Sequence, residues 1–338
     1  MNPSPDLRAT GAGIAVGHAT DAEGVTGLTV VRGVSGPMRA SAFVFGRATG
    51  TREVALLEPW ASNERIDAVL LTGGSAYGLD AAAGVMRWME ERGRGFPIAG
   101  GVVPIVPAAV VFDLAPLGRF DARPTAEMAY AACAGAVEFD IAEGSVGAGT
   151  GCTVGKVRGP LRAMKGGVGV GLASIPGVMA TGIGGSSASG RTATDLTAVA
   201  IAVVNAFGHV RDGNGAIIAG PRDDKGVPMD AEVAIAFGGA PSREAGSSTT
   251  ISVVALNVAL TKVELHQVAR AASAAYARRI GPAGSSFDGD IVFAVSPLAG
   301  PRVPLLQAEV VATSALEDAI VRAVRLARGR EGVPGLAD

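Results

Sequence analysis

The chain has 338 residues and a formal net charge of −2 at pH 7, and its acids and bases are spread along its length. It therefore offers no basic stripe for nucleic acid and no polybasic cluster for a membrane surface, and we expect neither partner. With 48% hydrophobic residues but only 4% aromatic ones, it predicts a large globular interior filled mainly by Ala, Val and Leu.

Neither a targeting segment nor a metal site is predicted. The opening MNPSPDLRATGAG lacks the pattern of a signal peptide, and no apolar run reaches the roughly 18 residues that span a bilayer, so we expect a cytoplasmic protein. Cys133 and Cys152 have no metal or redox spacing, and His18, His209 and His266 are scattered. We therefore expect no disulfide, metal or cofactor.

Short apolar strands and glycine-rich turns alternate through the first third of the chain, at 13–21, 27–33 and 40–46. The continuous apolar run that follows, DAVLLT, predicts a buried strand that stops at Gly73 and Gly74. Ser75 is then expected to cap a helix that ends at Gly93.

This strand, turn and helix predict a candidate oxyanion or substrate-pocket site, because such a junction directs backbone N–H groups and the positive end of a helix into a cavity. The residues involved are Gly73, Gly74, Ser75 and Tyr77. A tight turn that simply needs glycine is the alternative, since the stretch lacks both the phosphate-loop lysine and the dinucleotide glycine pattern.

Strands and helices continue to mix through the middle of the chain. Residues 101–114 contain prolines and predict an edge strand or pocket wall, and 125–138 predict a helix. Residues 143–177 are too rich in glycine for a helix, so we expect close backbone approach, tight turns or a wall against which a substrate lies. Residues 196–210 read as a buried strand, and 210–230 as a surface loop.

The last third predicts two strands and two helical regions. The strands fall at 250–258 and within 281–297; an amphipathic helix is expected at 262–280, and a long helix or helix pair at 303–329. No repeat or linker divides the chain, so we predict a single domain over residues 1–338, an α+β fold of layered sheets covered by helices.

Ser247, Ser248, Thr249 and Thr250 stand at the entrance to the strand at 250–258. Such a run is ordinary before a strand, and the chain has no Gly-x-Ser-x-Gly elbow. A cut before Thr249, however, would give it an α-amine able to act as base for its own hydroxyl. Threonine also has few rotamers, which would aim its Oγ.

Other candidate groups are scattered along the chain. Asn205 is an amide within an apolar run, where it needs hydrogen-bond partners, either as a backbone cap or as an oxyanion donor. Asp288 and Asp290 flank Gly289, so in an extended segment both carboxylates would face one site; a solvated turn is the alternative.

Lysine is rare in this chain, which otherwise uses arginine, so a lysine kept against that bias is a candidate for chemistry. Lys165, in AMKGGVG, could supply positive charge near the nucleophile, and Lys156, in VGKVRGP, is the competing candidate.

Taken together, these residues resemble the L-aminopeptidase/D-amidase-esterase family, which includes β-peptidyl aminopeptidases and 6-aminohexanoate-oligomer endohydrolases. The resemblance extends over nearly the whole chain, from GIAVGHATD through DAVLLTGGSAYGLDAAAGVMRWMEE, GVVPIVPAAVVFDL, MKGGVG and VVNAFG to TTISVVA and FDGDIVFA. Several motifs in the same order make it specific.

The resemblance implies an autoprocessing hydrolase of peptide or amide bonds with a four-layer αββα sandwich of the N-terminal-nucleophile type. It implies cleavage between Ser248 and Thr249 into a large subunit, 1–248, and a small subunit, 249–338, and assembly as a homo-oligomer, often of four such heterodimers. The matching positions are Thr249 for the nucleophile and, for the rest of the site, Asn205, Lys165, Asp288 and Asp290.

The Asp-Gly-Asp form resembles the nylon-oligomer branch more than the β-aminopeptidases, which carry Ser and Glu there. Two departures stand out: Ser248 precedes the nucleophile where that branch commonly has Asn, and residues 181–195 are an insertion that could alter the substrate wall or a subunit interface. Two alternatives stay open: acyl transfer to an amine, as in ornithine acetyltransferase-like enzymes, and a non-catalytic relative.

Overall fold

Two five-stranded sheets form the centre of the fold in the computed structural model, which describes residues 3–181, 191–238 and 248–338. The first sheet has the strand order β1 (Ile14–Asp21), β2 (Thr26–Gly33), β5 (Ala68–Thr72), β8 (Ala108–Val110), β4 (Thr51–Arg52). The second has the order β11 (Gly167–Thr181), β12 (Arg191–Asn205), β15 (Thr249–Leu256), β17 (Ile291–Ser296), β3 (Arg39–Val44).

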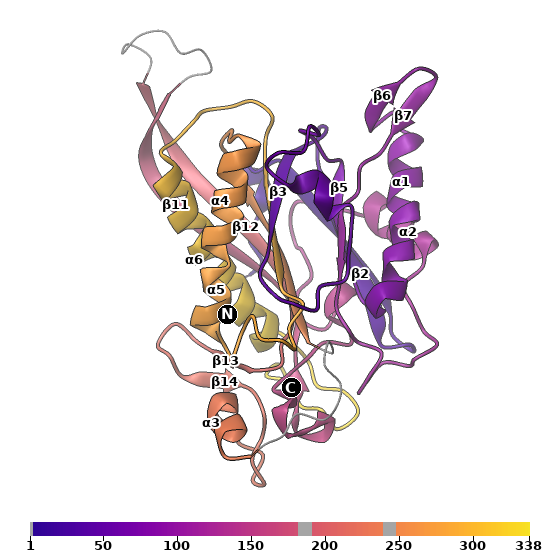
Figure 1. The fold of residues 1–338 in the computed structure, drawn as a ribbon, viewed down its shortest axis with the longest axis vertical. Helices are drawn as coiled ribbons and strands as arrows, with labels where there is room; N and C mark the ends of the chain where they lie inside the picture. Colours follow the sequence, from indigo (N-terminus) through magenta and orange to yellow (C-terminus); the bar gives the residue numbers. More distant parts are fainter. Residues whose placement is uncertain (1–2, 182–190, 239–247) are drawn as a thin grey trace.

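Helices cover the outer faces of both sheets (Figure 1). On one side lie α1 (Ala82–Glu90) and α2 (Ala126–Ala134), and on the other lie α4 (Lys262–Ala272), α5 (Ala274–Arg279) and α6 (Leu305–Arg325). Three buried apolar clusters fill the spaces between the layers: one under α1 and α2, one between the sheets, and one under α4 to α6. This confirms the predicted four-layer α+β fold.

The central strands of the second sheet are apolar on both faces because each face lies against another layer. Val203, Val253 and Phe293 point into the space between the sheets, while Val204 and Val254 pack under the helices. β12 and β15 pair antiparallel, and β15 and β17 pair parallel. The order and register of these three strands bring residues 205, 249 and 290 to one end of the sheet.

Glycines along β11 explain part of the glycine-rich stretch. Gly167, Gly169 and Gly171 share one face of the strand, and a Cβ on any of them would lie 2.1–2.6 Å from a backbone oxygen of α6. The long helix can therefore lie directly on the strand backbone. The sequence predicted close backbone approach, tight turns or a substrate wall here, and along β11 the structure confirms close backbone approach, of a helix onto a strand.

Three further element predictions are corrected. The helix expected from Ser75 begins as a 3-10 turn, η3 (Ser75–Ala81), and Ser75 is its first residue, with φ of 53°, rather than its cap. The loop expected at 210–230 contains a hairpin, β13 (His209–Arg211) and β14 (Ile217–Ala219). The helix expected at 262–280 divides into α4 and α5 at Ser273.

The remaining elements are short. They are β6 (Phe96–Ile98), β7 (Gly101–Val103), β9 (Thr153–Val154), β10 (Met164–Lys165), β16 (Ile280–Gly281), α3 (Ala231–Ala236), and the 3-10 turns η1 (Leu7–Thr10), η2 (Val54–Leu57), η4 (Gly147–Gly149), η5 (Lys156–Arg158) and η6 (Pro160–Arg162). Across the described ranges, no helix is both long and apolar enough to cross a membrane.

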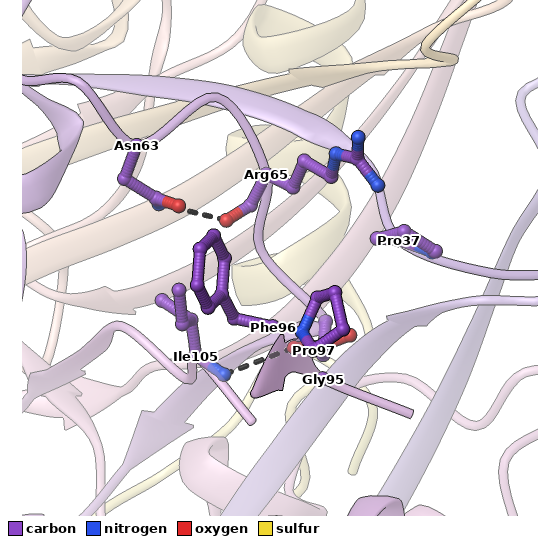
Figure 2. Close-up of a pocket in the computed structure, with 8 residues that line it drawn as sticks. Pro37, Asn63, Arg65, Gly95, Phe96, Pro97 and Ile105 are labelled. Carbon is purple, nitrogen blue, oxygen red and sulfur yellow. Dashed lines mark hydrogen bonds between the residues drawn. The ribbon is translucent and has the colours of Figure 1, made fainter. Parts of the chain in front are cut away.

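A small cavity lies beside the β6–β7 hairpin, and Figure 2 shows Phe96, Pro97 and Ile105 in its wall. The Asp67 carboxylate, just before β5, accepts the Ile105 N–H at 2.9 Å. Because Asp67 precedes β5 while Gly73 follows it, this cavity lies at the opposite end of that strand from the glycine turn.

Gly169→Ala is expected to lower the free energy of unfolding by about 1–3 kcal/mol, because the added methyl group would overlap the Ala319 carbonyl of α6. Urea denaturation measures the change. Gly213→Ala is the matched control, since a Cβ there meets no described atom within 4 Å. Equal midpoints for the two variants would contradict the close packing of α6 on β11.

Candidate active site

The Ser248–Thr249 peptide bond lies at the start of β15, where three segments meet. Thr249 is the pairing partner of Asn205, the last residue of β12, and Ser248 forms an isolated parallel bridge with Asp288. All four residues are buried; Thr249 is 3% exposed. The fold therefore brings together Thr249, Asn205 and the Asp288–Asp290 segment, from parts of the chain up to 85 positions apart (290 − 205).

Two donors meet the Ser248 carbonyl oxygen. The Thr249 hydroxyl donates to it at 2.6 Å, and the Gly289 N–H donates to it at 3.0 Å. A Cβ at position 289 would lie 2.9 Å from Thr249 Oγ1 and 2.6 Å from the Ala48 carbonyl oxygen, so only glycine fits. The Thr249 hydroxyl thus lies beside the Ser248 carbonyl, and a backbone N–H donates to the same oxygen, as an oxyanion donor would.

The Asn205 side chain is held from both ends. Its Oδ1 accepts the Thr153 N–H at 3.0 Å and the Lys156 Nζ at 2.9 Å, and its Nδ2 donates to the Phe112 carbonyl at 2.9 Å. Two donors on the oxygen and an acceptor on the nitrogen define which way the amide faces. The amide is therefore preorganised beside Thr249.

Lys156 is the lysine in contact with this cluster. Its Nζ also donates to the Asn205 carbonyl at 2.8 Å and approaches Ser248 Oγ at 3.4 Å. Burial lowers its pKa to about 7, against the opposing effect of Cys152, Asp288 and Asp290. The ammonium and the free amine are therefore both populated near neutral pH.

Lys165, the residue predicted for the site, contacts the backbone that immediately precedes Thr153. Its Nζ donates to the carbonyls of Thr150 at 2.7 Å and Cys152 at 2.8 Å, and burial lowers its pKa to about 8. It thereby holds the backbone of residues 150–152 in place. The next residue, Thr153, donates its N–H to Asn205 and orients that amide. The geometry favours Lys156, the competing candidate, as the lysine beside Asn205 and Ser248.

The two aspartates are buried and act on each other. Asp290 accepts the Thr250 N–H at 2.6 Å and the Gly284 N–H at 3.3 Å, while Asp288 accepts the Ser285 N–H at 2.9 Å and its hydroxyl at 2.5 Å. Burial, and then Asp288, raise the pKa of Asp290 to about 8, and burial also raises the pKa of Asp288. Asp290 therefore keeps its proton at neutral pH.

The glycine turn does not supply the predicted oxyanion donors, because its N–H groups are already used inside the fold. They donate to Gly27 O (from Gly73, 2.8 Å), Asp113 Oδ1 (from Gly74, 2.6 Å) and Val111 O (from Ser75, 3.0 Å). The turn still lies next to the site, since Asp113 follows Phe112, whose carbonyl holds Asn205.

Tyr77, the fourth residue predicted there, lies at the surface with 52% of its area exposed. The guanidinium of Arg123 lies 3.5 Å from the centre of its ring, and Phe120 packs against it edge-to-face. No contact of Tyr77 with Thr249 or Asn205 is seen among the described residues.

Gly289, Phe112 and Thr153 were not predicted from the sequence as site residues. Gly289 had a visible signal, because it stands between the two aspartates. Phe112 and Thr153 contribute only a backbone carbonyl and a backbone N–H, and side-chain chemistry gives no sign of such roles.

His209, Asp230 and Glu232 place donor atoms within 4.8 Å of one another, as a metal site would. Arg211, however, is paired with both carboxylates, at 3.3 and 3.1 Å. A guanidinium already neutralises the acids, so the donor set does not favour a cation.

Comparison with solved structures defines the class of fold. The L-aminopeptidase D-Ala-esterase/amidase from Ochrobactrum anthropi, described as a variant of the N-terminal-nucleophile hydrolase fold, aligns with a TM-score of 0.65 over 97% of this chain and 88% of its own, at 20% identity. A β-aminopeptidase from Burkholderia sp. aligns with a TM-score of 0.64 over 99% and 90%, at 19% identity. The chain has the N-terminal-nucleophile hydrolase fold.

Sequence comparison then gives the family. The chain matches peptidase family S58 over residues 11–161 and 160–336. It is 39% identical over 299 residues to an uncharacterized aminopeptidase of Mycobacterium tuberculosis (84% of this chain, 79% of the relative). It is 32% identical over 297 residues to a 6-aminohexanoate-oligomer endohydrolase of Agromyces sp. (84% and 73%). The chain belongs to peptidase family S58, as the resemblance indicated.

Asp290→Asn is expected to flatten the dependence of stability on pH. An aspartate in the unfolded chain ionises near pH 3.9, whereas Asp290 holds its proton to about pH 8, so its contribution to stability is full below pH 4 and is lost as pH rises to 8. The unfolding free energy should fall by about 1.4 kcal/mol per pH unit across this window. Urea denaturation at pH 5, 6 and 7, in a Thr249→Ala background, measures it.

The substituted amide keeps an acceptor for the Thr250 N–H, so the comparison isolates the titration. Identical slopes with and without Asp290 would show that it is ionised in the folded protein.

Proposed function

We propose that the protein cleaves itself between Ser248 and Thr249 and then uses Thr249 as an N-terminal nucleophile to hydrolyse amide bonds. The observation that carries the proposal is the Ser248 carbonyl, which lies between the Thr249 hydroxyl at 2.6 Å and the Gly289 N–H at 3.0 Å. Reacting groups held at such distances gain the rate advantage of an intramolecular reaction.

In self-cleavage, Thr249 Oγ bonds to the Ser248 carbonyl carbon, and the bond from that carbon to the Thr249 nitrogen breaks. The hydroxyl proton ends on the departing nitrogen, which becomes an amine, and Ser248 is left as an ester on Oγ. Water then hydrolyses the ester, giving fragments 1–248 and 249–338 and restoring the hydroxyl. Gly289 N–H stabilises the oxyanion formed in each step.

In turnover, the new α-amine of Thr249 takes the proton from its own hydroxyl, and Oγ attacks the substrate carbonyl. Asn205 lies opposite the nucleophile as a second polar group for the oxyanion, and Lys156 with the two aspartates holds the set in place. In this proposal Lys165 acts indirectly, by holding the backbone carbonyls of Thr150 and Cys152. The ester with the acyl group is then released by water.

The substrate class that we propose is the N-terminal residue of peptides and amides, or amide oligomers. Relatives named as aminopeptidases and as 6-aminohexanoate-oligomer endohydrolases support it, and the Asp288-Gly289-Asp290 sequence resembles the latter branch. A homo-oligomer of processed heterodimers, with four copies, is proposed from the resemblance alone, and a cytoplasmic location is proposed from the sequence.

Thr249→Ala is expected to abolish self-cleavage and amide hydrolysis, because no hydroxyl remains to attack. Mass spectrometry of the purified protein should show the two fragments for the wild type and a whole chain for the variant. Thr250→Val is the matched control: within the described part of the chain Thr250 Oγ1 has no hydrogen-bond partner, so cleavage should persist.

A folded wild-type chain that never divides before Thr249 would contradict the proposal. Product analysis with and without an added amine then separates hydrolysis from acyl transfer.

A further inference from the structure

The uncleaved chain carries its own acyl group in the reaction centre. In self-cleavage Thr249 Oγ attacks the Ser248 carbonyl, and in turnover the same Oγ attacks the substrate carbonyl, with the same Gly289 N–H on the oxygen. The acyl residue of a substrate must therefore lie where Ser248 lies. The surroundings of Ser248 describe the acyl subsite, an inference that rests on the proposed function.

Three contacts define how Ser248 is held. Its carbonyl accepts the Gly289 N–H, its backbone forms the parallel bridge with Asp288, and its side-chain oxygen lies 3.4 Å from Lys156 Nζ. Ser248 is fully buried, and its contact with the half-buried Lys156 is part-buried. An acyl residue bound in this way is extended and points its side chain at an ammonium.

We propose that Lys156 is the residue that selects the acyl group, and that the subsite takes short acyl residues bearing a hydroxyl, of the seryl or threonyl type, over apolar or cationic ones of similar size. A hydroxyl at this point accepts from Nζ. A hydrocarbon side chain leaves the Lys156 amine facing an apolar group, which costs free energy. A cationic side chain meets a like charge.

The position of Lys156 is fixed independently of Ser248. Its backbone N–H donates to the Phe207 carbonyl at 3.0 Å, and its Nζ donates to both oxygens of Asn205. Phe207 in turn stacks on Phe287, the residue before Asp288, with ring centres 5.2 Å apart. Lys156 and the Phe287–Asp288 segment, which pairs with the backbone of Ser248, are therefore held together through Phe207.

Self-cleavage supplies a test that needs no added substrate, because position 248 can be varied while the nucleophile stays. Ser248→Thr and Ser248→Val are isosteres that differ in the hydroxyl. We expect Ser248→Thr to cleave about tenfold faster than Ser248→Val, and Ser248→Lys to cleave more slowly than either. Quenched time courses read by mass spectrometry give the rates, and circular dichroism confirms that each variant is folded.

In a Lys156→Met background the difference between the Thr and Val variants should shrink to less than twofold, because the ammonium is gone. Processed wild-type protein should likewise hydrolyse threonyl p-nitroanilide with a higher kcat/KM than the valyl compound. A Thr-to-Val ratio near one in the chain with Lys156, or a ratio unchanged by Lys156→Met, would overturn the assignment. A wild-type chain that does not divide before Thr249 would instead refute the proposed function itself.

Discussion

Asn205 and Thr249 pair with each other at the ends of β12 and β15, and both are buried. The rest of the site depends on this constraint. An amide side chain buried at this depth needs hydrogen-bond partners, because an unpaired polar group costs roughly 1–3 kcal/mol. Asn205 meets this requirement through Thr153, Lys156 and Phe112. Thr153 and Lys156 belong to one segment and Phe112 to another, so the amide joins two separate pieces of backbone beside Thr249.

The same burial sets the charges of the site. Taking Lys156 and Asp290 out of water disfavours their ionised forms, which brings the pKa of Lys156 to about 7 and that of Asp290 to about 8. Groups that exchange protons near neutral pH are suited to catalysis, and holding them costs stability. The three apolar clusters between the four layers offset that cost.

Much of this architecture could be predicted from the sequence. The apolar runs that became β12, β15 and β17 have the length and composition of buried strands, and the order of several motifs indicated the family and its fold. The residues that meet at Ser248–Thr249 include four that were expected: Thr249, Asn205, Asp288 and Asp290. Polar and charged side chains are unusual at buried positions, so these residues can be recognised from a single sequence.

The errors share a physical cause, which is that backbone contacts leave little trace in a sequence. Lys165 and Lys156 are equally rare lysines, and only the three-dimensional course of the segment between them shows which ammonium reaches Asn205. Gly73 to Ser75 have donors suited to an oxyanion, but the folded chain already uses them. For the glycines of β11 the sequence left close backbone approach, turns and a substrate wall open, and only the fold shows that they allow a helix to pack on the strand.

The central claim is that Thr249 forms the covalent bond with the acyl group, and trapping that bond tests it most directly. The processed protein would be mixed with an activated aminoacyl ester, quenched in acid during turnover, digested and mapped by mass spectrometry. The account predicts an acyl group on Oγ of Thr249, at the first position of the 249–338 fragment. Rapid ester hydrolysis with the acyl group on another residue would contradict it.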